Sequence, residues 1–166
     1  MSSYLLELIE VFLRVEPPNA NEIFEVLFKW MTNADEDVAS YIIGVVTESM
    51  KRIDVNTELL TSIIDYLASI AEMASAVRLR HNIAYFLSNF LEKYNDQFEV
   101  VSHFLPYLDK WWAEGKDKEI GYQRCLSNIA VLYLRLFVSG AQVQVESVDK
   151  AISAFPPADA TETENM

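Results

Sequence analysis

The chain has 166 residues, 51% of them hydrophobic, and a formal net charge of −12 at pH 7. This size is enough for the core of one domain, whereas the excess of carboxylates disfavours naked nucleic acid as a ligand, because phosphate binding needs clustered lysine and arginine. No apolar run reaches the ~18 residues of a membrane span, and the first residues lack the basic segment of a signal peptide. Cys125 is the single cysteine, which excludes an internal disulfide framework. We therefore expect a soluble intracellular protein without membrane insertion.

Apolar residues at helical spacing occur throughout the chain and predict an all-α protein, because no alternating strand pattern competes with them. The first helix is predicted at residues 4–14 and ends before Pro17-Pro18, since a proline disfavours helix at the residue before it. Asn19 or Asn21 is expected to cap the next helix. The remaining helices are predicted as three pairs, over about 19–53, 57–94 and 97–139, and a short terminal helix that contains Val145, Val148 and Ile152.

Two residues are expected to disturb or end predicted helices. Pro106 falls inside the helix predicted at 96–113, where its missing N–H and its ring should produce a kink. Gly140 follows the helix predicted at 118–138 and is expected to close it as a C-cap, because glycine adopts the left-handed conformation without strain.

One short phrase occurs three times: Ile43-Gly44-Val45-Val46, Ile83-Ala84-Tyr85-Phe86 and Ile129-Ala130-Val131-Leu132. Its second residue is always small, which allows two helices to pack closely. The copies are 40 and 46 residues apart, and a period of about 40–47 residues made of two helices is typical of HEAT and armadillo arrays. We therefore predict an α-α superhelix, a HEAT/armadillo-like solenoid, as a single domain over 1–157. The acidic tail at 158–166 is expected to be disordered.

Four segments resemble a known family, the importin-β (karyopherin-β) type nuclear transport receptors. Residues 79–87 resemble the "V-R-x-N-A-A-Y-x-L" opening of an inner HEAT helix in the branch that carries ribosomal proteins and histones. Residues 104–108 resemble the "L-P-x-L" of the following outer helix, and residues 119–130 resemble the next inner helix. Residues 148–159 resemble a "V-L-P…L-P-x-x-D" outer helix and its exit. The resemblance covers about residues 75–160.

This resemblance implies a non-enzymatic protein-interaction module without cofactors, present in cytoplasm and nucleus. Its implied partners are basic cargo proteins of the ribosomal-protein or histone type, and phenylalanine-glycine (FG) nucleoporins. The Ran GTPase is an implied partner only if the N-terminal repeats that bind it are supplied elsewhere in the polypeptide. The alternative function is a HEAT-repeat structural scaffold, similar to phosphatase- or chromatin-associated subunits, that holds protein partners.

Two asparagines and two acidic residues are candidates for partner binding. Asn82 and Asn128 each precede an Ile-Ala pair, where an amide can bind the backbone of an extended peptide or form a hydrogen bond between adjacent helices. Asp37 belongs to the acidic run at 35–37, which the dipole of a beginning helix favours. Together with Glu48, it is also a candidate for an acidic groove that attracts basic cargo.

Trp112 is the remaining candidate for partner binding, because exposed aromatic residues commonly anchor interfaces. In the adjacent pair Trp111-Trp112, we expect one side chain to face the core and the other to be half-exposed. His81 and His103 lack ligand-spaced neighbours, so no zinc site is expected. Cys125 lies in an apolar helical stretch and is expected to be a buried small hydrophobe, not a nucleophile.

The two ends of the predicted solenoid differ. A solenoid needs polar outer faces at its ends, because a missing neighbour leaves apolar surface uncovered. The helix at 4–14 carries Glu7 and Glu10, and we expect it to cap the front with acidic outer residues. The terminal helix is short and apolar. We therefore predict self-association through the C-terminal end, or instability of the chain alone.

Overall fold

The computed structural model describes residues 3–115, 120–143 and 145–153, and every regular element in these ranges is helical. The helices are α1 (Ser3–Leu13), α2 (Ala20–Met31), α3 (Glu36–Met50), α4 (Thr57–Ala71), α5 (Val77–Lys93), the 3-10 turn η1 (Asn95–Gln97), α6 (Phe98–Ser102), α7 (Leu105–Gly115), α8 (Ile120–Val138) and α9 (Val145–Ser153). The all-α prediction is therefore confirmed. The tail at 158–166, predicted to be disordered, lies outside the described residues.

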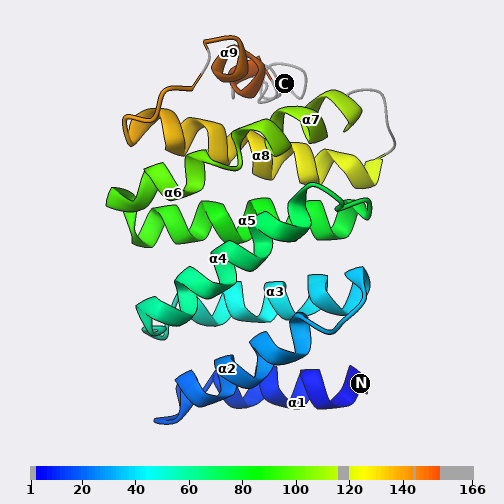
Figure 1. Cartoon of the computed structure of the whole chain (residues 1–166), viewed down its shortest axis with the longest axis vertical. Coiled ribbons are helices and arrows are strands. Elements are labelled where there is room, and N and C mark those ends of the chain that lie inside the picture. Colours follow the sequence, from blue (N-terminus) through cyan, green and yellow to red (C-terminus); the bar gives the residue numbers. More distant parts are fainter. Residues whose placement is uncertain (1–2, 116–119, 144, 154–166) are drawn as a thin grey trace, which may run out of the picture.

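The helices are stacked as successive pairs (Figure 1). In one layer, α1, α3, α5 and α8 lie one above the other, and each contacts the next. In the other layer, α2, α4 and the broken helix α6–α7 cross in front of them and connect successive members. The predicted helix pairs thus correspond to α2–α3, α4–α5 and α6–α7 with α8, while α1 and α9 flank them. This repetitive all-helical architecture is the one that the sequence predicts.

One apolar core runs through the whole stack, and most residues of the repeated phrase lie in it. Ile43, Ile83 and Ile129 are all buried, as are the small residues Ala84 and Ala130. These two alanines fit the expected role of a small residue at a close helix crossing. Gly44 is different, because a Cβ added there would meet only Asn82 Nδ2 at 3.8 Å, an ordinary contact. The packing therefore does not require glycine in the first copy.

The helix predicted at 96–113 is broken rather than kinked. Its first part is η1 and α6, and α7 begins anew at Leu105 after a turn at His103 and Phe104. Pro106 consequently occupies the first turn of α7, where a backbone N–H would lack an intrahelical partner in any case. Pro106 is therefore accommodated by the start of a new helix at Leu105, and no kink within a continuous helix is needed.

Gly140 ends α8 as predicted, with φ +95°. The N–H of Gly140 donates to the carbonyl of Phe137 at 3.1 Å, and the N–H of Ala141 donates to that of Leu136 at 3.0 Å. This pair of bonds is the Schellman motif, which satisfies two carbonyls at the end of a helix.

The asparagines at the start of α2 behave only in part as predicted. Asn19 holds the N-cap position but makes no side-chain cap bond. Asn21 instead reaches the next helix pair, where its Oδ1 accepts from the N–H of Asn56 at 2.8 Å and its Nδ2 donates to the carbonyl of Asp54 at 3.4 Å. Asn56 in turn caps α4 by accepting from the N–H of Glu58 at 2.9 Å. The asparagine thus orders the entry to the following repeat.

Helix ends of one pair are completed by side chains of its neighbour. The N-cap residue of α5 is Ala76, which has no capping side chain, and Glu36 of α3 accepts from its N–H at 2.8 Å and from the N–H of Ser75 at 3.1 Å. In the opposite direction, Lys93 of α5 donates to the carbonyl of Met50, the last residue of α3, at 3.0 Å. Each contact satisfies backbone groups that a helix terminus leaves open.

Replacing Glu36 by alanine should lower the free energy of unfolding by about 1–2 kcal/mol, because two amides lose their acceptor. Asp37→Ala is the matched control: it removes an exposed carboxylate from the same helical turn and should cost no more than about 0.5 kcal/mol. Urea unfolding followed by circular dichroism measures both values. Equal losses in the two variants would contradict the proposed capping.

The same pair of variants predicts a pH dependence. Burial raises the pKa of Glu36, but hydrogen bonds from Ser75 and Ala76 outweigh it and hold that pKa below its usual range. The stabilisation is therefore present above the ordinary glutamate pKa and is lost as the pH falls through the folded-state value. The stability gap between Glu36→Ala and Asp37→Ala should narrow in acid.

A buried arginine joins the second helix pair to the third. Arg80 of α5 is only 8% exposed. Its Nε donates to the carbonyl of Ala74 at 2.7 Å, and its Nη1 donates to Tyr122 Oη at 2.7 Å and to Glu114 Oε2 at 2.5 Å. The guanidinium also lies over the ring of Trp111, 5.8 Å from its centroid. This single side chain therefore contacts a loop, α7 and α8.

The outer face of α1 is largely apolar, so the expected acidic front cap is present only in part: Glu7 is exposed, and Glu10 is half-buried. Glu10 points toward α3, where it accepts from Tyr41 Oη at 3.2 Å, while several large apolar side chains are exposed, namely Tyr4, Leu5, Leu8, Val11 and Phe12. Near the other end, Phe137, Val138 and Ile152 are exposed as well. Both ends of the stack thus present apolar surface, and self-association through the C-terminal end stays a prediction.

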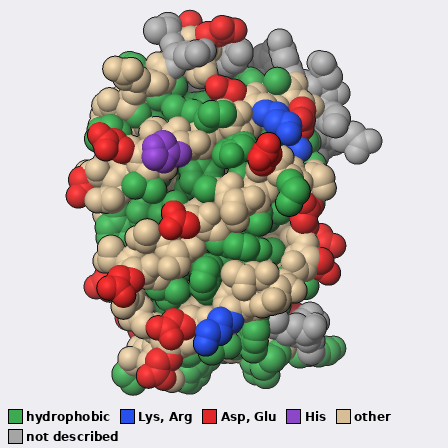
Figure 2. Space-filling model, viewed as in Figure 1, with side chains coloured by type: hydrophobic (Ala, Val, Ile, Leu, Met, Phe, Trp, Pro, Cys, Tyr) green, Lys and Arg blue, Asp and Glu red, His purple; other side chains and the backbone are tan. Residues whose placement is uncertain are grey.

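Acidic side chains are spread among apolar ones over the face formed by α2, α4 and α6–α7, and basic side chains gather there at a few places (Figure 2). Within the described part of the chain, no helix has the length and hydrophobicity to cross a bilayer.

Candidate functional site

A groove of about 720 Å³ lies on the layer of α1, α3, α5 and α8. All four helices contribute lining residues. Those of α3 and of α5 recur at helical spacing, so they lie on one face of each helix. It contains two of the predicted partner-binding residues, Asn82 and Glu48. The other lining residues are Glu10, Tyr41, Gly44, Val45, Val77, Arg78, His81, Tyr85 and Arg124.

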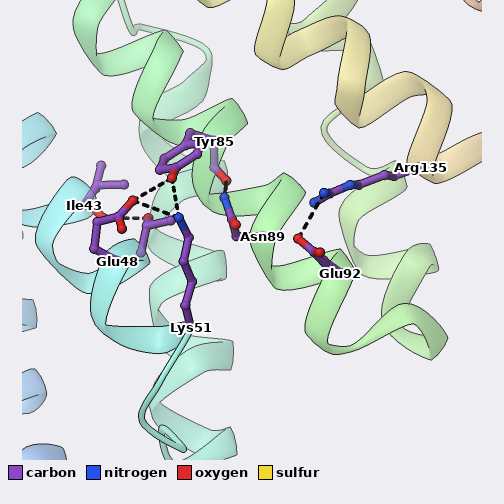
Figure 3. A network of polar contacts seen from close by, with 8 residues as sticks. Ile43, Glu48, Lys51, Tyr85, Asn89, Glu92 and Arg135 are labelled. Carbon is purple, nitrogen blue, oxygen red and sulfur yellow. Dashed lines mark hydrogen bonds and ion pairs between the residues drawn. The ribbon is translucent and has the colours of Figure 1, made fainter. Parts of the chain in front are cut away.

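Glu48 belongs to a polar cluster that links α3 to α5 (Figure 3). Its carboxylate accepts from Tyr85 Oη at 2.5 Å and from Lys51 Nζ at 2.9 Å, and Lys51 also lies 4.8 Å from the centroid of the Tyr85 ring. Burial raises the pKa of Glu48, but the hydrogen bonds from Tyr85 and Lys51 hold it below the usual range. Glu48 is therefore ionised at neutral pH, and its charge is already compensated.

The two asparagines connect successive helices of the groove layer. Asn82 Nδ2 donates to the carbonyl of Ser40 on α3 at 2.7 Å, and Asn128 Nδ2 lies 3.0 Å from His81 Nδ1 on α5. These are the hydrogen bonds between adjacent helices that the sequence left open as the alternative role. Asn82 also lines the groove, whereas Asn128 does not. Binding of a peptide backbone by either asparagine stays a prediction.

His81 lies at the centre of these contacts. Its ring stacks on that of Tyr85 at 6.3 Å between centroids. Burial lowers the pKa of His81, a hydrogen bond with the backbone of Arg124 opposes this, and the positive charges of Arg124 and Arg78 lower the pKa further. A neutral imidazole accepts a hydrogen bond at one nitrogen and donates one at the other, which fits the position of His81 between the amide of Asn128 and the backbone of Arg124.

Asp37 and Trp112 lie outside the groove. Asp37 is exposed on the first turn of α3, where Asp35 is the capping residue and accepts from the N–H of Val38 at 2.9 Å. The structure does not place Asp37 and Glu48 together in one acidic groove, because only Glu48 lines the groove. Trp112 is half-buried with its ring against Tyr133, 6.1 Å between centroids. As expected for the pair, its neighbour is fully buried in the core.

Arg78 and Arg124 are the groove residues that the sequence analysis missed. Both are exposed and lie on neighbouring helices, α5 and α8. A signal for Arg78 existed, because positions 78, 82 and 85 share one face of a helix, and that face includes the predicted Asn82. The overall negative charge favours carboxylates, not arginines, as the predicted binding groups.

Cys125 has the character expected of a buried small hydrophobe. It is inaccessible to solvent, and burial raises its pKa to about 12, so the unreactive thiol is the form present at neutral pH. His103 is exposed. The described ranges contain no group of three or more His, Cys, Asp and Glu side chains that could hold a metal ion.

The site is therefore an open groove that combines aromatic and aliphatic side chains with paired carboxylates and two arginines. Comparison of the chain with protein-family models, with curated proteins and with solved structures found no match.

Proposed function

We propose that this protein is a non-enzymatic interaction module that binds an extended segment of a partner protein in the groove of α1, α3, α5 and α8. The observation that carries the proposal is the groove itself. It spans four stacked helices and combines apolar contacts from Val45 and Val77 with hydrogen-bonding groups from Asn82 and Tyr85. Stacked helical repeats form extended binding surfaces of this kind.

A nuclear import receptor segment is the function that the family resemblance favours, with basic cargo proteins and FG nucleoporins as partners. The net charge of −12 and the acidic side chains over the outer helices support attraction of basic proteins (Figure 2). A HEAT-type scaffold subunit is the alternative. Salt separates the two, because cargo held by surface charge is released as ionic strength rises, whereas a scaffold keeps a constitutive stoichiometric partner.

Substitutions of Gly44 test whether the groove is the binding surface. Gly44 lines the groove, and the nearest atom to an added Cβ is 3.8 Å away. Gly44→Met places a long side chain in the groove with little expected effect on the helix, since methionine has good helix propensity. Gly44→Ala is the matched control, because it adds only a methyl group and leaves the groove open.

The parent chain and both variants are used to capture proteins from a nuclear-plus-cytosolic extract at low and raised salt. We expect the parent and Gly44→Ala to retain the same partner in fixed proportion, and Gly44→Met to lose it while its thermal unfolding remains cooperative. Equal capture by all three proteins would overturn the groove as the binding surface. Among retained partners, release of ribosomal or histone proteins by salt supports the receptor function, and a salt-resistant partner supports the scaffold.

A further inference from the structure

The carboxylates of the groove form ion pairs within the described ranges, whereas its arginines do not. Arg78 and Arg124 are exposed and line the groove, yet the ion pairs within the described ranges all involve other cations. Both guanidinium groups lie close enough to His81 to lower its pKa. The groove therefore carries two arginines from adjacent helices that form no ion pair with a carboxylate in the part of the chain that the structure describes.

The carboxylates of the groove, in contrast, already have cationic partners. Glu10 pairs with Arg14 at 2.9 Å, and Glu48 pairs with Lys51 at 2.9 Å. Each of these two carboxylates thus has a cation of its own, and the two arginines are additional. The charges of the lining residues balance, two carboxylates against two arginines, but the carboxylates are paired with Arg14 and Lys51, so Arg78 and Arg124 are the lining charges that no ion pair within the described ranges involves.

We infer that the groove selects an acidic peptide segment, in which an Asp or Glu carboxylate bridges Arg78 and Arg124. The inference rests on the proposed function and narrows it: the groove holds an acidic segment of the partner, whereas the attraction of basic proteins proposed above belongs to the acidic side chains over the outer helices. Guanidinium groups bind carboxylates through paired, charge-assisted hydrogen bonds. The flanking residues of the segment would contact Val45 and the ring of Tyr85, which lie in the same groove.

The negative charge of the rest of the surface does not prevent this binding. At physiological ionic strength the Debye length is about 8 Å, so exposed carboxylates beyond that distance are largely screened from a ligand in the groove. The two arginines act at contact distance, where screening is weak. Local pairing therefore decides the sign of the preferred ligand, and the net charge of the chain affects mainly the rate of encounter.

Two short peptides test the preference directly. The probes are N-acetylated, C-amidated hexapeptides, Gly-Ser-Glu-Glu-Ser-Gly and its counterpart Gly-Ser-Lys-Lys-Ser-Gly, titrated into the ¹⁵N-labelled full chain and followed by backbone amide and arginine Nε–H signals. We expect the Glu-Glu peptide to shift signals of Arg78, His81 and Arg124. The double variant Arg78→Gln/Arg124→Gln should lower its affinity by about tenfold or more, because two charge-assisted contacts are lost.

Lys29→Gln/Lys110→Gln is the charge-matched control, since both lysines are exposed and neither lines the groove. Unchanged affinity in this control supports a local site rather than an effect of net charge. Equal weakening in both double variants, or groove shifts caused by the Lys-Lys peptide and not by the Glu-Glu peptide, would overturn the inference.

The outcomes also separate this inference from the proposed function. If Gly44→Met abolishes partner capture but Arg78→Gln/Arg124→Gln changes neither capture nor peptide affinity, the groove function stands and its acidic preference is wrong. If the Glu-Glu peptide binds at Arg78 and Arg124 while capture is insensitive to Gly44→Met, the acidic site stands and the proposed partner-binding role of the groove is wrong.

Discussion

Replacing Arg80 by methionine should lower the free energy of unfolding by about 3 kcal/mol, at the lower end of the range for breaking a buried ion pair. Methionine fills part of the space but donates no hydrogen bond, so the carbonyl of Ala74 and the hydroxyl of Tyr122 lose their partner in a buried setting. Glu114 limits the loss, because its side chain is 38% exposed and water can solvate it.

Arg78→Met is the matched control for this prediction. It is the same substitution two residues earlier on α5, but Arg78 is exposed, so its loss should change stability by no more than about 0.5 kcal/mol. Chemical unfolding monitored by circular dichroism and by tryptophan fluorescence compares the two variants, with Trp111 beside Arg80 as a local probe. A loss at position 80 no larger than that at position 78 would show that the buried network contributes no net stability.

Gly115→Ala should lower stability by about 1–3 kcal/mol, the usual cost of forcing extra volume into a packed site. A Cβ at this position would overlap the ring of Tyr122 and would lie 3.1 Å from Leu126 Cδ2. The ring has little freedom to move aside, because it is buried and its hydroxyl accepts from Arg80 at 2.7 Å. Relief of the overlap therefore disturbs the same network that joins α5, α7 and α8.

Gly44→Ala should raise the stability of the protein, in contrast to Gly115→Ala. Gly44 lies within α3, and its added Cβ meets only one atom, at an ordinary distance. Alanine is favoured over glycine in a helix interior by about 0.5–1 kcal/mol, so Gly44→Ala should raise the melting temperature while Gly115→Ala lowers it. Scanning calorimetry of the two variants measures both shifts, and a decrease for Gly44→Ala would mean that α3 packs more tightly there than the structure shows.

Much of the fold follows from the sequence because each helix marks its buried side by apolar residues at helical spacing. Ile43, Ile83 and Ile129 illustrate this: a repeated local phrase identified three equivalent core positions, and all three are buried. The helix pairs could be predicted for the same reason, since a two-helix repeat buries its apolar faces mainly against its sequence neighbours.

The polar links between pairs could not be predicted, because their partners lie far away in the sequence. Glu36 caps a helix that begins about forty residues later, and Asn21 binds the backbone of Asn56. Local rules assign such residues to the nearest helix end, and for Asn21 that assignment fails. Only the packing of one pair on the next brings these groups together.

The candidate site was predictable in part, for a related reason. Asn82 and Glu48 were identified as single residues, and the structure places both in the groove. Arg78 and Arg124 were missed because net charge is a sum over the whole surface, whereas a ligand contacts the few charges that are left unpaired in one place. Pairing depends on side-chain geometry, as the contact of Glu48 with Lys51 and Tyr85 shows.

The exchange of caps between α3 and α5 has a consequence for how this protein can be divided. Glu36 completes the start of α5 and Lys93 completes the end of α3, so a cut between these pairs would leave one helix frayed at its beginning and the other at its end. Dissection at the loops that separate the repeats would therefore give two poorly folded fragments rather than two minimal units. We therefore expect the smallest fragment that folds on its own to contain both helices that share these termini, and so to extend across the repeat boundary that the sequence predicts.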